Sequence, residues 1–153
     1  MEPKVKPKSF TYDVDVRWVA ERKGRMGADG KPTLEVATPP EFKGHPGIWS
    51  PEDLFVSAVN VCTMSTFLTF AIRHNVKFLD YRSHARGLLE KVDDKYRFTE
   101  ITVEPVVTLP EGGDAEEARE ALHMAHEHCL IANSISARVV MNEKIEFAGG
   151  DQK

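Results

Sequence analysis

The chain has 153 residues, of which 41% are hydrophobic and 29% charged, and its formal net charge is −4. These values are ordinary for one soluble globular domain, which at this size buries about 70% of its extended-chain surface. The mild acidity gives no electrostatic reason to expect a nucleic acid or an anionic membrane as a partner. We expect one domain over residues 1–153, with residues 1–9 as a flexible tail.

The ends and the hydropathy of the chain favour a cytoplasmic location. Residues 1–8 lack the apolar core of a secretory signal, and no run reaches the ~18 uninterrupted apolar residues of a membrane span. We therefore expect no membrane partner. In a reducing compartment the two cysteines, Cys62 and Cys129, are expected to be catalytic, metal-binding or inert rather than a permanent disulfide.

Two strands are predicted at the N-terminal end. Residues 10–19 alternate polar and apolar side chains, with Tyr12, Val14, Val16 and Trp18 on one face. This alternation predicts a half-buried strand. Residues 33–38 follow a turn and are expected to form a second strand paired with the first.

The segment Ser50–Asp53 predicts the start of a helix that ends near His74. Serine suits the N-cap, proline suits the first helical position, and the two acids face the positive end of the helix dipole. Apolar residues cover most of the circumference of this helix. The pattern predicts a long buried helix at the centre of the fold.

The remaining residues predict a hairpin, a second helix and a last strand. Residues 81–92 and 96–109 form the predicted hairpin, Asp114–His128 the helix, and residues 136–147 the strand. The order β-β-α-β-β-α-β indicates an α+β fold in which antiparallel sheets wrap the buried helix.

Cys62 lies about halfway along the first predicted helix. A buried free cysteine often packs as a small hydrophobe, so an inert role is one interpretation. However, Asn60, Thr63, Ser65 and Thr66 lie within about one turn of it. Because buried polar groups need hydrogen-bond partners, these residues favour a pocket at Cys62 over plain packing.

Cys129 ends the second predicted helix, where the partial negative charge of the dipole disfavours a thiolate. It is therefore the poorer nucleophile and the better candidate for a resolving thiol. Cys62 needs a positive neighbour to activate it, and no basic residue lies close to it in sequence. We expect that neighbour to come from elsewhere in the fold.

A zinc site is an alternative use of the same residues. His123, His126 and Cys129 share one broad helix face, and Cys62 could supply a fourth ligand. The spacing matches no familiar zinc motif, and histidines in the last turns of a helix also favour its negative end. We expect no metal and no cofactor, and keep a non-catalytic thiol or zinc-binding protein as the alternative.

Three segments belong together: Glu21–Arg25 after the opening strand, Ala37–Gly44 followed by Ser50–Phe55 and Cys62, and Ala125–Cys129 followed by Asn133. With them the chain resembles the OsmC/Ohr family, the osmotically inducible protein C and organic hydroperoxide resistance proteins. Together the three segments cover most of residues 10–147 in the family's order. The resemblance implies the OsmC-like fold and an intertwined homodimer, with two sites formed where the subunits meet.

The resemblance also implies an activity. It is a thiol-dependent peroxidase, an antioxidant enzyme of the oxidative stress response that reduces organic hydroperoxides, and hydrogen peroxide more slowly. By resemblance, Cys62 is the peroxidatic cysteine and Cys129 the resolving one, and they form a redox-active disulfide. An external dithiol then reduces this disulfide, for which a lipoylated protein is a candidate.

The resemblance assigns the activating arginine to Arg22 and its glutamate partner to Glu52. The Arg22 assignment needs a one-residue gap in the following turn, so Arg17 and Arg25 stay open. Ten residues along a straight helix separate Glu52 from Cys62 by about 15 Å. We therefore expect Glu52 or Arg22 to come from the partner chain, unless the helix start is bent or a long arginine makes the contact.

Some residues depart from the family pattern. Leu130 stands where the family often has proline after its second cysteine, and Asn60 stands where a small residue is more usual. These changes leave the subfamily and the preferred peroxide open. Phe42, Trp49 and Phe67 are candidates for a peroxide pocket, or equally for core or dimer interface.

Overall fold

The computed structural model describes residues 6–150. The chain divides into two compact units, Met1–Asp53 and Leu54–Lys153, and each is described by itself. Residues 1–5 of the predicted tail lie outside the described residues, and residues 6–14 contain no helix or strand. The expectation of one domain stays a prediction.

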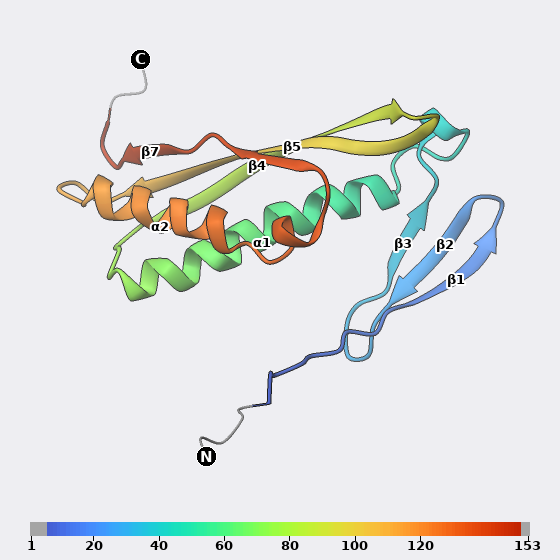
Figure 1. Ribbon diagram of the computed structural model, residues 1–153, viewed down its shortest axis with the longest axis horizontal. Helices are drawn as coiled ribbons and strands as arrows, with labels where there is room; N and C mark the ends of the chain where they lie inside the picture. The colour runs from blue at the N-terminus through green and yellow to red at the C-terminus, as the bar shows by residue number, and fades with distance from the viewer. Residues whose placement is uncertain (1–5, 151–153) are drawn as a thin grey trace. The chain divides into compact units, whose positions relative to one another are not determined.

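The first unit contains a three-stranded antiparallel sheet (Figure 1). Its strands are β1 (Asp15–Ala20), β2 (Lys23–Gly27) and β3 (Leu34–Ala37), in that spatial order, and a short 3₁₀ helix η1 (Pro40–Phe42) follows them. The second predicted strand exists but pairs with β2, so the predicted pairing with the first strand is wrong. We did not predict β2 because its Lys-Gly-Arg sequence is typical of a solvated turn.

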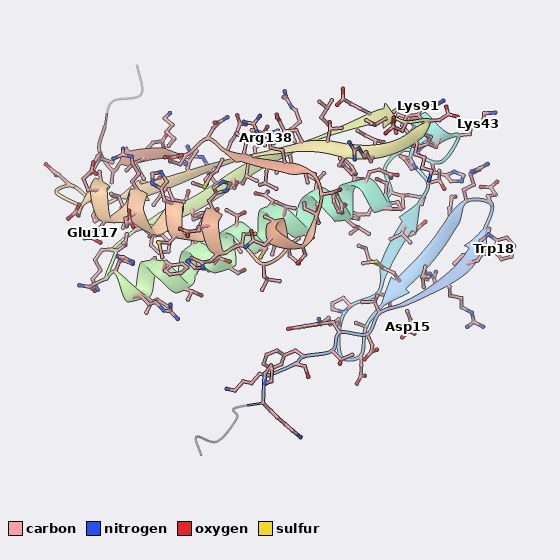
Figure 2. The ribbon with its side chains drawn as sticks, viewed as in Figure 1. Asp15, Trp18, Lys43, Lys91, Glu117 and Arg138 are labelled. Atoms are coloured by element: carbon pink, nitrogen blue, oxygen red, sulfur yellow. The ribbon has the colours of Figure 1, made fainter. Side chains whose placement is uncertain are left out.

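One face of this sheet is apolar and the other is charged. Cross-strand pairing joins Arg17 to Arg25 and Arg25 to Glu35 on the charged face. The apolar face carries Val16, Trp18, Met26, Leu34 and Val36. The expected half-burial of the first strand is wrong within this chain, because all of β1 is exposed. Trp18 projects outward (Figure 2) with 73% of its surface exposed.

The second unit contains a four-stranded sheet, two helices and a 3₁₀ turn. Its elements are α1 (Pro51–Arg73, whose first turn belongs to the first unit), β4 (Asp80–Val92), β5 (Lys95–Leu109), α2 (Ala115–His128), η2 (Ala132–Ser134), β6 (Arg138–Met141) and β7 (Lys144–Phe147). The hairpin β4–β5 is antiparallel, whereas β6 and β7 both pair parallel to β5. The α+β class is confirmed, with a mixed second sheet. The predicted last strand is two strands, separated by Asn142 and Glu143.

Both helices begin where the sequence predicts. The Ser50 hydroxyl accepts the Asp53 N–H at 3.1 Å, and the Asp53 carboxylate accepts the Ser50 N–H at 3.0 Å. This reciprocal pair is a capping box. The Asp114 carboxylate likewise accepts the N–H groups of Glu116 and Glu117 at the start of α2.

Helix α1 is buried along one face. Figure 1 shows α1 and α2 on the same side of the β4–β5 hairpin. The buried residues of α1 are Val59, Cys62, Thr63, Phe67, Phe70 and Ala71. On the opposite face Val61 is 58% exposed and Ile72 82% exposed. Helix α1 is also long and apolar enough to cross a membrane, a test that core helices of soluble proteins pass as well.

Two apolar clusters hold α1 on the sheet. Phe67 belongs to the cluster with α2, and Val59 to the cluster around Ile101 at the middle of β5. Phe67 is fully buried, so it is a core residue rather than a pocket residue. Cys62 and Thr63 therefore lie on the packed face of α1, between the two clusters.

Candidate active site

The structure brings the two predicted cysteines together. Cys62 lies on α1 and Cys129 follows α2, and both are free and buried, with 9% and 1% of their surfaces exposed. The two sulfurs are close enough that Cys129 lowers the pKa of Cys62 and Cys62 raises the pKa of Cys129. The helix end at Cys129 thus supplies a second thiol to the middle of α1.

The turn after α2 fixes the position of Cys129. Cys129 leaves the helix in an extended conformation, with φ −65° and ψ 105°. The Asn133 N–H donates to the Cys129 carbonyl at 3.0 Å, and the Asn133 side-chain amide donates to the Glu127 carbonyl at 3.0 Å. These bonds satisfy carbonyls that the end of a helix leaves unpaired.

Hydrogen bonds to sulfur lower the pKa of Cys62. Burial raises the pKa of the Cys62 thiol, but four donors together outweigh burial and leave the pKa below its ordinary value. In order of effect they are the Ile131 N–H, the Cys129 thiol, the Thr66 hydroxyl and the Leu130 N–H. They favour the thiolate, which is the nucleophilic form of cysteine.

The pKa of Cys129, in contrast, is raised above its ordinary value. Burial raises its pKa, and the neighbouring Cys62 sulfur raises it further. The Ala132 N–H and the Thr63 hydroxyl act in the other direction but do not outweigh these effects. The inequality between the two thiols agrees with the sequence analysis, although its main cause is burial rather than the helix dipole.

Two of the four polar residues predicted around Cys62 contact a cysteine sulfur. The Thr66 hydroxyl lies 3.9 Å from the Cys62 sulfur, and the Thr63 hydroxyl lies 3.9 Å from the Cys129 sulfur. The Ser65 hydroxyl is exposed and donates to the Cys62 carbonyl at 3.1 Å. Of the polar residues predicted around Cys62, Thr66 therefore contacts Cys62 itself, whereas Thr63 contacts Cys129.

Asn60, the fourth polar residue, faces β4 instead. Its side-chain amide donates to the Ser83 carbonyl at 3.4 Å. Its Oδ1 atom is buried without a hydrogen-bond partner among residues 6–150. The hydroxyls of Ser83 and Tyr81 are also buried. Burial raises the pKa of Tyr81 to about 12, so its phenol stays neutral.

Arg22 belongs to the first unit, beside the apolar face of its sheet. Together with apolar residues of β1 and β3 it lines an open groove of about 390 Å³ (Val16, Trp18, Arg22, Lys23, Gly24, Val36, Ala37, Thr38 and Pro51). Its backbone carbonyl accepts the Thr38 N–H at 3.1 Å. Arg17 and Arg25 lie on the charged face, so of these three arginines only Arg22 borders the groove.

Glu52 also belongs to the first unit. Since Asp53 caps α1, the Glu52 carboxylate is not used for capping. Its Oε2 atom is buried and has no hydrogen-bond partner within the described part of the chain. A buried carboxylate oxygen is costly without a donor, so Glu52 is placed to accept one.

The residues proposed as zinc ligands do not form a metal site in the described part of the chain. Within residues 6–150 no group of three or more His, Cys, Asp or Glu side chains is arranged to hold a metal ion. His123 instead pairs with Glu143 at 2.8 Å. Burial raises the pKa of Glu143, but the hydrogen bond from His123, a backbone hydrogen bond and the charges of His123 and Arg119 together outweigh burial, so the pKa is lowered overall.

Known structures share this fold. An OsmC-like protein of unknown function from Vibrio cholerae matches with a TM-score of 0.78 and 23% identity, covering 88% of this chain and 99% of the other. An organic hydroperoxide resistance protein OsmC from Legionella pneumophila matches with a TM-score of 0.72 and 22% identity, covering 92% and 99%. An organic hydroperoxide resistance protein from Elizabethkingia anophelis, with thiocyanate bound, matches with a TM-score of 0.73 and 18% identity, covering 93% of this chain and 99% of the other.

The comparison with curated proteins gives no match. The sequence profile of the family described as OsmC-like protein matches residues 44–144. This range includes α1, both cysteines and most of the mixed sheet. Because the match extends over more than half of the chain, this protein belongs to the OsmC-like family.

Proposed function

We propose that this protein is a cysteine-based peroxidase that reduces organic hydroperoxides. The observation that carries the proposal is the buried contact between two free thiols, of which Cys62 has the lowered pKa. The Legionella and Elizabethkingia proteins with this fold are named organic hydroperoxide resistance proteins, which is consistent with such a substrate. A reducing cytoplasmic location, which keeps thiols available between turnovers, is part of the proposal.

The proposed reaction uses both cysteines. The Cys62 thiolate attacks the distal oxygen of the peroxide, the O–O bond breaks, and the alcohol leaves after taking up a proton. Cys62 is then a sulfenic acid, which condenses with the Cys129 thiol to a disulfide and releases water. An external dithiol reduces the disulfide by thiol–disulfide exchange.

Arg22 and Glu52 complete the proposed site. A guanidinium stays charged and offers several donors, so it can hold a thiolate and a peroxide together. The Oε2 atom of Glu52, which has no hydrogen-bond partner in the described part of the chain, is a suitable acceptor for one arm of that guanidinium. The position of Arg22 beside the apolar groove supports choosing it over Arg17 and Arg25.

A homodimer is part of the proposal. Each unit exposes an apolar surface, Trp18 and its neighbours in the first and the face of α1 with Val61 and Ile72 in the second. Exposed apolar surfaces of this kind mark interaction sites. Because ten residues of α1 separate Glu52 from Cys62 by about 15 Å, we propose that Glu52 or Arg22 acts on a cysteine of the second subunit.

Peroxide consumption tests this function. Stopped-flow mixing of the reduced protein with cumene hydroperoxide and dithiothreitol should show turnover, which Cys62→Ser abolishes. Arg22→Ala should slow the oxidation of Cys62 by about tenfold or more, since each pKa unit of lost thiolate stabilisation corresponds to a tenfold change. Arg25→Ala, which removes an equal charge from the opposite face of the sheet, should react as the wild type does.

Failure of the reduced wild-type protein to consume peroxide would instead indicate a thiol-binding protein without turnover. Stoichiometric zinc in the purified protein would indicate the structural alternative.

A further inference from the structure

Thr63 is a buried polar residue, only 3% exposed, whose hydroxyl has two acceptors. The Val59 carbonyl lies 2.9 Å from the hydroxyl oxygen and the Cys129 sulfur 3.9 Å from it. A hydroxyl has one proton to donate, so it serves one acceptor at a time. The carbonyl is the nearer and stronger acceptor as long as Cys129 is a neutral thiol.

Deprotonation of Cys129 reverses that preference. A charged acceptor forms hydrogen bonds roughly twice as strong as a neutral one. The Val59 carbonyl, being inside α1, keeps its place in the backbone ladder when the hydroxyl leaves it. The Thr63 hydroxyl can therefore rotate toward a Cys129 thiolate at little cost.

We propose that Thr63 is a catalytic residue of the disulfide-forming step, in which its hydroxyl turns from the Val59 carbonyl to the Cys129 sulfur and stabilises the attacking thiolate. This role rests on the proposed function, which supplies the sulfenic acid at Cys62. In the step, Cys129 loses its proton and its sulfur forms a bond to the Cys62 sulfur. The S–O bond of the sulfenic acid breaks, and the oxygen leaves with both protons as water.

Thr66 is the counterpart of Thr63 at the other cysteine. Its hydroxyl lies 2.8 Å from the Cys62 carbonyl and 3.9 Å from the Cys62 sulfur. The two threonines are therefore expected to act in different steps of the reaction. Thr66 contacts the sulfur that reacts with the peroxide, and Thr63 contacts the sulfur that closes the disulfide. A variant at Thr63 should affect only the second step.

The test follows both steps in time. Reduced protein is mixed with one equivalent of cumene hydroperoxide and quenched at intervals, and intact mass reports sulfenic acid, trapped with dimedone, and disulfide. Thr63→Val should form the sulfenic acid at the wild-type rate and close the disulfide about three- to tenfold more slowly, as expected for the loss of one hydrogen bond. The pH at which the rate of disulfide closure begins to rise should also be higher in Thr63→Val than in the wild type.

Matched variants separate catalysis from packing. Thr63→Ser keeps the hydroxyl and should restore closure, while Thr63→Ala is a second hydroxyl-free variant if valine does not fold. Thr69→Val removes a similar bond, from an exposed hydroxyl to the Ser65 carbonyl at 3.2 Å, and should change neither step.

Wild-type closure rates in Thr63→Val and Thr63→Ala would overturn the role of Thr63 and leave the peroxidase proposal standing. An equal slowing of both steps would also overturn it, since that is the signature of a packing defect. A wild-type protein that forms no sulfenic acid would overturn the proposed function, and the role of Thr63 with it.

Discussion

At the scale of single residues, the chemistry depends on which donors face which sulfur. The backbone amides of Leu130 and Ile131 stabilise the Cys62 thiolate. The sequence could predict that Cys62 needs activation, but it could not identify these donors, because every residue except proline carries an N–H. It did identify the threonines, since polar side chains are conspicuous on an apolar helix.

The Leu130 amide can be removed selectively. Leu130→Pro deletes the N–H, and the extended conformation of Cys129 is one that a residue before proline readily adopts. With one donor fewer, the pKa of Cys62 should rise. The pH midpoint of Cys62 alkylation by iodoacetamide, measured by peptide mass, should therefore move to higher pH.

Leu130→Ala keeps the amide and controls for the lost side chain, so its midpoint should match that of the wild type. In the unfolded wild-type protein Cys62 and Cys129 should titrate together near the ordinary pKa. A Leu130→Pro midpoint at or below that of Leu130→Ala would show that this amide does not stabilise the thiolate.

At the scale of elements, sequence reasoning succeeded where local chemistry decides the structure. The capping residues Ser50 and Asp114 marked the starts of both helices, and the β4–β5 hairpin was predicted from two segments joined by a short turn. It failed for β2 and for the division of residues 136–147 into β6 and β7. Strand β2 pairs with its neighbours in the chain, but its Lys-Gly-Arg sequence is typical of a solvated turn. Strands β6 and β7 pair with β5, and a partner distant in sequence leaves no local signal.

Asp114 gives a direct test of the capping argument. Its carboxylate accepts two N–H groups at 3.0 and 3.1 Å. Asp114→Ala should reduce the free energy of unfolding by about 1 kcal/mol, because the first turn of α2 loses its acceptor. Urea denaturation measures this change. Asp114→Asn keeps an acceptor and should lose much less, whereas equal losses in both variants would contradict the capping role.

At the scale of the whole molecule, large apolar side chains stay exposed within residues 6–150. Periodicity showed that α1 is apolar nearly all round, but it could not say whether the second face is covered by this chain or by another one. Val61 and Ile72 are exposed, although their neighbours in the sequence, Cys62 and Ala71, are buried. The same limit applies to Arg22 and Glu52, whose proposed target is a cysteine of the second subunit.

A homodimer should therefore sediment at twice the 17.2 kDa mass of the chain. Val61→Glu places a charge on the exposed face of α1, and should shift the protein toward monomer and lower peroxide turnover together, because burying an unpaired charge is costly. Lys95→Glu makes a charge change at the tip of the hairpin and should leave the dimer intact. Full turnover by a monomer would contradict the shared site.

The most direct test of the central claim is the intact mass of the reduced protein after one equivalent of an organic hydroperoxide. The wild type should lose roughly 2 Da, which reports a disulfide between Cys62 and Cys129. Cys129→Ser should instead gain roughly 16 Da as a stable sulfenic acid on Cys62. An unmodified Cys62 in both proteins would contradict the assignment of this cysteine as the peroxide-reducing residue.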